Sequence, residues 1–213
     1  MADAETVQIG EHGLEGYLVR PGASGAMVLF AHGSGSSRHS RRNAYVAAEL
    51  QAAGFGTLLF DLLTSEEASD RRQVFNIELL GARMLEAMTW LEQDAGLARA
   101  PLGLFGASTG AAAALVAAAE RPERVGAVVS RGGRPDLASA ALRDVRCPSL
   151  FVVGGGDTTV IDLNRSALEK LTCTKRLEIV PRATHLFEEP GALERVVALA
   201  SDWFRTYLAT ATA

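Results

Sequence analysis

The chain has 213 residues, of which 48% are hydrophobic and 22% charged, with a formal net charge of −4 at pH 7. This composition predicts a globular protein with one domain over residues 1–213 and a full core, and the acidic balance argues against nonspecific nucleic-acid binding. The acidic start lacks the order of a signal peptide and no apolar run reaches a bilayer-spanning length, so we expect a cytoplasmic protein without membrane or nucleic-acid partners.

The first half of the chain contains an expected edge hairpin and then alternating elements. Residues 6–20 alternate around turn-like glycines, which predicts an antiparallel hairpin with His12 on its exposed turn. Residues 26–31 form a continuous apolar run, typical of a strand buried on both faces. Residues 43–53 have helical spacing, 56–63 predict a strand, the acidic segment 65–70 is expected to be a loop, and 75–93 predict an amphipathic helix.

The second half repeats a strand and helix rhythm. Apolar runs at 102–105, 125–130, 148–153 and 176–180 predict strands, and helices are expected after the first of these to Ala119 and at 135–142, 161–171 and 191–208. Strands that alternate with helices in this way indicate a parallel sheet with helices on both faces. The two cysteines, Cys147 and Cys173, have no metal-ligand spacing, so we expect reduced structural thiols and no metal site.

A glycine-framed serine lies between the strand at 102–105 and the alanine-rich helix. The segment Gly106-x-Ser108-x-Gly110 is the G-x-S-x-G pattern, in which a sharp turn presents a serine hydroxyl above the sheet edge. The pentapeptide alone is common. The strand before it and the helix after it make Ser108 a candidate nucleophile.

Two further polar residues follow later strands, where chemistry gathers in parallel sheets. Asp157 comes after a run of three glycines that ends one strand, and His185 comes after the next strand. The order serine, acid, histidine differs from that of other serine hydrolase folds. Chain order and the adjacent glycines favour Asp157 over the other candidate acids Asp61, Asp136 and Asp162, and Asp61 is then expected to cap a loop.

The segment from His32 to Ser37 follows the apolar strand at 26–31 and consists largely of Gly and Ser. Such small residues leave backbone N–H groups free to point at an anion, the second ingredient of an acyl-transfer site. His32 is expected to anchor this loop by hydrogen bonds instead of acting as a base. His39 is expected to be solvated.

The whole chain, from the His32-Gly33-Ser34-Gly35 loop through Gly106-Ala107-Ser108-Thr109-Gly110 to Gly156-Asp157 and Thr184-His185, resembles the α/β-hydrolase superfamily. It looks most like the small branch related to dienelactone hydrolases. The resemblance implies an α/β-hydrolase fold with a mostly parallel central sheet. Only one short helix fits between Ser130 and Cys147, where a lid is often inserted, so we expect no sizeable cap domain and an open, shallow site.

A serine at the elbow implies an esterase, thioesterase or lactonase, and it weighs against relatives with an aspartate nucleophile. Dienelactone hydrolase itself carries a cysteine there, so its substrate is not carried over. We predict a serine hydrolase that cleaves small soluble carboxylic esters, thioesters or lactones through an acyl-enzyme on Ser108, without a cofactor. His185 would be the base, Asp157 would orient it, and the backbone N–H groups of Thr109 and Ser34 would hold the oxyanion.

Two alternatives stay open at this stage. A non-catalytic binding or scaffold protein of the same fold is possible, although such relatives typically lack one of the three candidate residues. The small-molecule acyl substrate is also undefined: Gly33 and arginines that leave strand ends could favour a carboxylate- or phosphate-bearing substrate, or the arginines could simply be solvated. These arginines are Arg38, Arg41, Arg42, Arg131 and Arg134.

Overall fold

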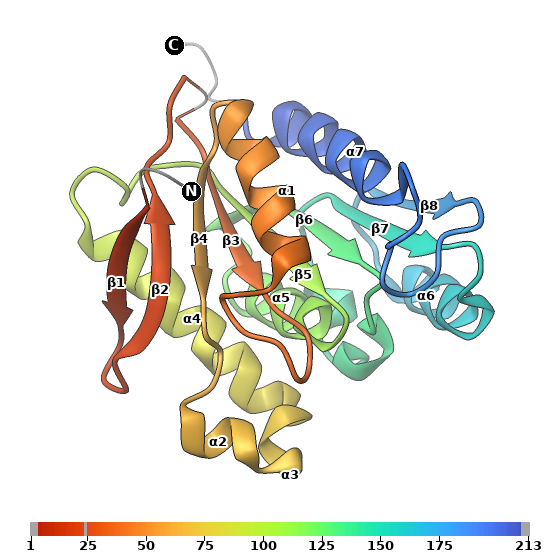
Figure 1. The fold of residues 1–213 in the computed structure, drawn as a ribbon, viewed down its shortest axis with the longest axis horizontal. Helices are drawn as coiled ribbons and strands as arrows, with labels where there is room; N and C mark the ends of the chain where they lie inside the picture. Colours follow the sequence, from red (N-terminus) through yellow and green to blue (C-terminus); the bar gives the residue numbers. More distant parts are fainter. Residues whose placement is uncertain (1–3, 24, 210–213) are drawn as a thin grey trace.

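The computed structural model describes residues 4–23 and 25–209 and is built around one eight-stranded sheet (Figure 1). The strands lie in the order β1-β2-β4-β3-β5-β6-β7-β8. The edge hairpin is antiparallel and β2 pairs antiparallel with β4, whereas all remaining pairs are parallel. The strand bounds are β1 (Glu5–Ile9), β2 (Leu14–Val19), β3 (Met27–Ala31), β4 (Gly56–Phe60), β5 (Leu102–Ala107), β6 (Val125–Arg131), β7 (Ser149–Gly154) and β8 (Lys175–Val180).

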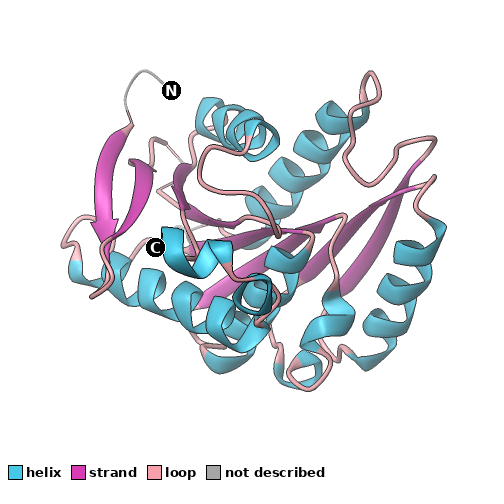
Figure 2. Ribbon diagram, turned by 60° about the horizontal axis from the view of Figure 1, so that its bottom comes forward, coloured by secondary structure: helices cyan, strands magenta, loops and turns pink. Residues whose placement is uncertain are grey.

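Helices cover both faces of the sheet, as predicted (Figure 2). One face packs against α1 (Arg41–Ala52) and α7 (Ala192–Tyr207), and the other against α4 (Ile77–Gln93), α5 (Thr109–Glu120) and α6 (Thr158–Lys170). Every residue of β3, β4, β5 and β7 is buried, which explains why these strands are continuously apolar instead of alternating. The expected α/β-hydrolase architecture is therefore confirmed.

The expectation of a loop at residues 65–70 is wrong, because this segment contains the short helix α2 (Ser65–Ser69), followed by α3 (Arg71–Val74). Thr64 starts α2 through a capping box: its hydroxyl accepts the Glu67 N–H at 3.2 Å, and the Glu67 carboxylate accepts the Thr64 N–H at 2.8 Å. These reciprocal bonds satisfy the first backbone donors of the helix. An acidic sequence with this cap is therefore helical.

The segment between β6 and β7 also differs in detail from the single short helix expected at 135–142. It contains two 3₁₀ helices, η1 (Pro135–Ala138) and η2 (Leu142–Asp144), in which backbone bonds span three residues, and this tight winding limits each to about one turn. This segment contains no cap domain, in agreement with the prediction. Among the described helices, none is both long and apolar enough to cross a membrane.

Candidate active site

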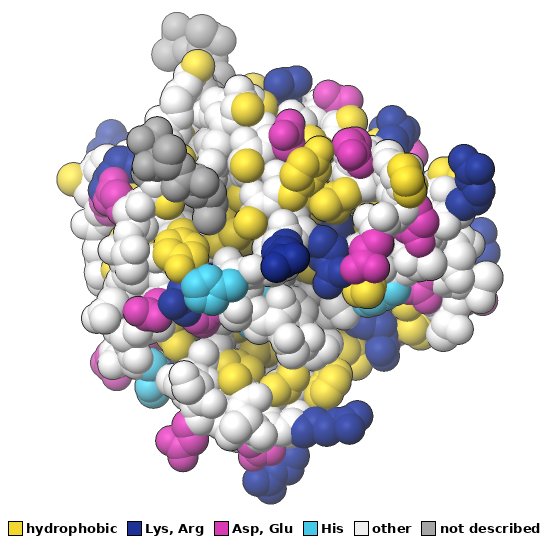
Figure 3. All heavy atoms as spheres, viewed as in Figure 1, with side chains coloured by type: hydrophobic (Ala, Val, Ile, Leu, Met, Phe, Trp, Pro, Cys, Tyr) yellow, Lys and Arg dark blue, Asp and Glu magenta, His cyan; other side chains and the backbone are white. Residues whose placement is uncertain are grey.

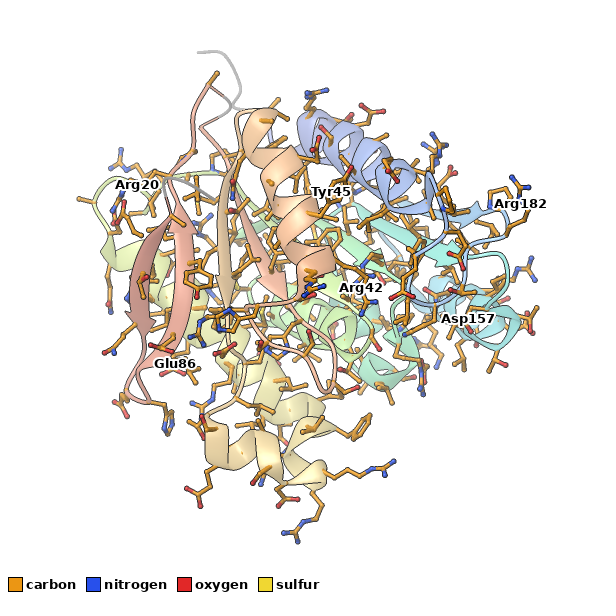
Figure 4. The ribbon with its side chains drawn as sticks, viewed as in Figure 1. Arg20, Arg42, Tyr45, Glu86, Asp157 and Arg182 are labelled. Carbon is orange, nitrogen blue, oxygen red and sulfur yellow. The ribbon has the colours of Figure 1, made fainter. Side chains whose placement is uncertain are left out.

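The carboxyl ends of six neighbouring parallel strands, from β4 to β8 in the sheet order, meet at one edge of the sheet. The chain runs from β3 to β4 on one side and then to β5 on the other side of β3, so β3 and β5 flank the point where ligands bind in open α/β sheets. The 32–37 loop follows β3, and Ser108 follows β5. Figure 4 shows Asp157 beyond β7 and Arg42 at the start of α1, both at this edge.

Ser108 lies in a strained backbone conformation at the turn from β5 to α5. Its φ of 53° and ψ of −122° are unusual for a residue with a side chain. Two glycines make the turn possible, because a Cβ on Gly106 would lie 2.4 Å from the Ala111 Cα, and one on Gly110 would lie 2.3 Å from the Ala31 oxygen. The local fold thus demands both glycines of the pattern.

Backbone hydrogen bonds tie this elbow to the end of the neighbouring strand β6. The Ser108 N–H donates to the Arg131 oxygen at 3.2 Å, and the Arg134 N–H donates to the Ser108 oxygen at 3.0 Å. Strain at a single residue persists only when its surroundings fix it. These two bonds, with the close packing at the glycines, supply that constraint.

Asp157 and His185 are hydrogen-bonded, with 2.7 Å between Asp157 Oδ2 and His185 Nδ1. Asp157 is the N-cap residue of α6, but its side chain caps no backbone N–H and is therefore free for the imidazole. The His185 loop is held by Glu189, whose carboxylate accepts the Thr184 N–H at 3.0 Å. Ser108 and His185 both line a cavity of about 250 Å³, which we call the small cavity.

The 32–37 loop lies directly against Ser108 and is anchored by His32. The His32 Nε2 accepts the Leu62 N–H at 3.0 Å, which leaves Nδ1 to donate to the Gly33 oxygen, also at 3.0 Å. The bond from Leu62 requires an unprotonated Nε2 and so a neutral ring, and burial lowers the pKa of His32. The predicted anchoring role of His32 agrees with this geometry.

A second cavity of about 520 Å³, which we call the large cavity, lies on the far side of the same loop. Gly33, Ser34, Ser36 and Ser40 line both cavities, so the loop separates them. Thr109 also lines the large cavity. Apolar side chains after β4 and on α2 to α4 line it as well, namely Leu62, Leu63, Ala68, Val74 and Leu80, together with the polar residues His39, Asp61, Thr64 and Ser65.

Sequence reasoning missed this cavity, because it treated the segment after β4 as a loop. The signal was present in the spacing Thr64-x-x-Glu67, which is typical of a helix start. The site is thus bordered by the short helices α2 and α3, although it has no cap between β6 and β7.

The five candidate arginines differ in whether they line a cavity of the site. Arg38 donates to Asp61 and Glu15 and lines neither cavity, and Arg134 pairs with Asp136 at 2.8 Å outside both. The remaining three are Arg41, which is exposed, and Arg42 and Arg131, which line the small cavity.

The competing acids are likewise engaged or remote. Asp61 accepts the Arg38 N–H at 2.7 Å, which agrees with the expected loop cap. Asp162 is exposed on α6 beside Arg165. Within the described ranges, no group of three His, Cys, Asp or Glu side chains is arranged to hold a metal ion.

The chain is similar to a described family and to several known proteins. Residues 26–176 match a family described as the alpha/beta hydrolase fold. A dienelactone hydrolase from Anabaena variabilis has 57% sequence identity and a TM-score of 0.92, and the match covers 97% of each chain. Est1E from Butyrivibrio proteoclasticus has a TM-score of 0.81 over 97% of this chain and 99% of its own, but with 14% identity it shows only the shared fold.

A curated relative from Mycobacterium tuberculosis is 54% identical over 206 residues, which are 96% of this chain and 46% of that protein. It carries a provisional phosphoribosyl transferase name. The chain therefore spans about half the length of this relative.

Proposed function

Because the chain belongs to the α/β-hydrolase family and is related to its dienelactone hydrolase branch, we propose that it is a serine hydrolase of small carboxylic esters, thioesters or lactones. The observation that carries this proposal is the Asp157–His185 hydrogen bond beside the cavity that Ser108 lines. An activated serine needs a base, and the base needs a partner that fixes its ring. These three side chains supply those groups.

In the proposed mechanism, His185 accepts the Ser108 proton as the hydroxyl attacks the substrate carbonyl. The Asp157 bond places a hydrogen on Nδ1, so that Nε2 is the basic nitrogen, and the carboxylate stabilises the imidazolium that forms. His185 then donates this proton to the leaving group. Water, deprotonated by the same ring, hydrolyses the acyl-enzyme.

The negative charge on the carbonyl oxygen requires hydrogen-bond donors beside Ser108. Thr109 is the first residue of α5, so its N–H has no acceptor within the helix and lies at the positive end of the helix dipole. Ser34 lies on the adjacent loop and lines both cavities, so its N–H is our candidate for the second donor. One such donor contributes about 10²- to 10³-fold in rate.

The large cavity is our candidate for the substrate's apolar part. Its volume of about 520 Å³ is in the range of small-molecule sites, which lie between about 300 and 1,000 Å³. Polar side chains, among them several serines and Asp61, line it together with aliphatic side chains. This lining favours a short aliphatic chain over a long lipid tail.

Neither the transferase name of the longer relative nor a scaffold role is carried over to this chain. The relative is about twice as long, and a phosphoribosyl transferase has no need for a serine elbow with a paired histidine. A scaffold has no need for the strained Ser108 backbone or the Asp157–His185 bond, which we interpret as preorganised catalytic geometry.

The test combines a fluorophosphonate probe with a panel of short p-nitrophenyl esters, thioesters and amides. We expect the probe to label Ser108, and Ser108→Ala to lose labelling and to lower kcat by about 10⁴-fold or more. Ser130→Ala is the matched control, because Ser130 is buried one strand away, lines neither cavity and leaves its Oγ without a partner in the described chain. Unchanged hydrolysis by Ser108→Ala, or labelling at another residue, would contradict the proposal.

A further inference from the structure

Arg131 is a buried cation without a carboxylate partner. It ends β6, is 7% exposed and lines the small cavity beside Ser108. Across the described residues, no Asp or Glu lies within ion-pair distance of its guanidinium, and its Nε has no hydrogen-bond partner. One long contact of 3.4 Å joins its Nη2 to the Asn43 Oδ1.

A second buried arginine, Arg83, differs from Arg131 because it has carboxylate partners. Arg83 is 6% exposed, and its guanidinium pairs with both Glu67 at 2.9 Å and Glu86 at 3.1 Å. Burial of a charge is costly unless the charge is paired and hydrogen-bonded. Arg83 therefore resembles a structural ion pair, whereas Arg131 lacks the anion that would compensate it.

The surroundings of Arg131 increase its need for an anion. Burial and then the nearby Arg42 lower its pKa to about 10, so it stays protonated at neutral pH. Its guanidinium carbon lies 5.8 Å from the centre of the Phe187 ring, a contact that offsets part of the burial cost but supplies no hydrogen bond.

The first turn of α1 adds positive potential to the same cavity. Ser40, Arg42 and Asn43 line it, and they surround the N-terminus of a helix of 12 residues. Arg42 is half-exposed and pairs with the exposed Glu188 at 2.9 Å. In Figure 3, basic side chains gather on the surface where α1 starts.

We propose that Arg131, assisted by Arg42 and Asn43, binds an anionic group of the substrate, a carboxylate or phosphate, in the small cavity. This inference rests on the proposed ester hydrolysis and defines its substrate class. The Arg131 backbone oxygen accepts the Ser108 N–H, so the main chain that carries the guanidinium is tied to that of the nucleophile. A substrate is thus selected when its anionic group and its ester are separated by a short, matching chain.

The experiment compares esters that differ only in charge. Monomethyl glutarate carries a carboxylate where neutral methyl 5-methylhexanoate carries an isopropyl group, and 2-acetoxyethyl phosphate is compared with 2-acetoxyethyl propyl ether. We expect kcat/KM of the wild-type protein to be at least about tenfold higher for one anionic ester than for its neutral partner. The pair that shows this preference identifies carboxylate or phosphate as the recognised group.

Variants then assign the preference to Arg131. Arg131→Gln is expected to abolish the anionic preference, and Arg131→Lys to keep only part of it, because a lysine lacks the planar two-pronged geometry. Arg134→Gln is the matched control: it removes the same charge from a neighbouring residue that is already paired with Asp136, and it should keep the preference. Equal preference in Arg131→Gln and the wild-type protein would overturn the proposal.

A binding measurement keeps this test separate from the proposed function. Calorimetry of Ser108→Ala with glutarate and with inorganic phosphate should detect binding of one anion, and adding Arg131→Gln should weaken it at least about tenfold. If no ester is hydrolysed but this Arg131-dependent binding is found, ester hydrolysis fails and the anion site stands. If neutral and anionic esters are hydrolysed equally and neither anion binds, the anion site fails and ester hydrolysis stands. Should Arg131→Gln not fold, Arg42→Gln at the surface takes its place, with weaker anion binding expected and unchanged binding counting against the site.

Discussion

Gly33 lies so close to Ser108 that a Cβ at position 33 would be 2.9 Å from the Ser108 Cβ and 3.1 Å from the Ala107 oxygen. Neither neighbour can move easily, since one belongs to the strained elbow and the other is backbone. The loop after β3 therefore needs glycine at this position in order to approach the candidate nucleophile. This approach brings the Ser34 N–H to the reacting carbonyl in the proposed mechanism.

Gly33→Ala should consequently displace the loop and remove one oxyanion donor. We expect kcat/KM for p-nitrophenyl esters to fall by about 10²-fold or more, the size of the effect of losing one such donor. Gly22→Ala is the control for the substitution itself, because a Cβ at position 22 would meet its nearest neighbour at an ordinary 3.6 Å. An active Gly33→Ala enzyme would mean that this loop does not hold the oxyanion.

Asp157→Asn should retain the fold but lose most activity. The Asp157 carboxylate makes no helix-capping bond, so its removal takes little from α6, whereas an amide favours the wrong tautomer of His185. We expect kcat to fall by about 10⁴-fold, as it does for the equivalent change in a serine protease. Asp162→Asn, on the exposed face of the same helix, should change neither kcat nor Tm. Near-normal turnover by Asp157→Asn would exclude Asp157 as the orienting acid.

The sequence predicted the strands and the polar residues that follow them, because buried parallel strands are continuously apolar and end abruptly. Ser108, Asp157 and His185 were identified in this way, and the structure brings the first and last of them to one cavity. The predicted ends of the helices differ by a few residues from those in the structure. Residues such as Asn76, whose side chain accepts the Leu79 N–H at 3.1 Å, decide those ends locally.

The roles of the arginines could not be obtained from the sequence. Arg38 and Arg131 both follow apolar strands, but only the folded chain shows that Asp61 neutralises the first and that no described carboxylate neutralises the second. Ion pairing between residues far apart in the chain leaves no local pattern. The same holds for the pair between Arg83 on α4 and Glu67 on α2, which connects the two helices.

His32 should make the stability of the protein depend on pH. In the folded protein the His32 ring is neutral, because Nε2 accepts the Leu62 N–H. Burial lowers the pKa of His32 below the ordinary value of about 6.5. As the pH falls below about 6.5, the unfolded chain takes up a proton that the folded protein resists. The free energy of unfolding from this residue is therefore highest above this pH and decreases as the solution becomes more acidic.

Urea unfolding between pH 8 and pH 5 measures this dependence. His32→Gln keeps an acceptor for the Leu62 N–H but does not titrate, so its free energy of unfolding should fall less steeply than that of the wild-type protein. His12→Gln, on an exposed turn, should keep the wild-type slope. Identical slopes for wild type and His32→Gln would show that His32 is not held neutral by the fold.

Cys147 should be almost inert towards thiol reagents in the folded protein. It is 5% exposed, and burial, with a smaller effect from Cys173, raises the pKa of its thiol to about 12. Only the thiolate reacts, and at pH 8 a thiol with this pKa is ionised in about one molecule in ten thousand.

Labelling by iodoacetamide at pH 8, followed by peptide mass spectrometry, should modify Cys173 before Cys147, because Cys173 is only half-buried. In guanidinium chloride both should react at similar rates, and Cys147 should be modified at least about 10³-fold faster than in the native state. A Cys173→Ser variant isolates the Cys147 rate, and rapid native labelling of this variant would show that the amino-terminal end of β7 opens far more often than its packing implies.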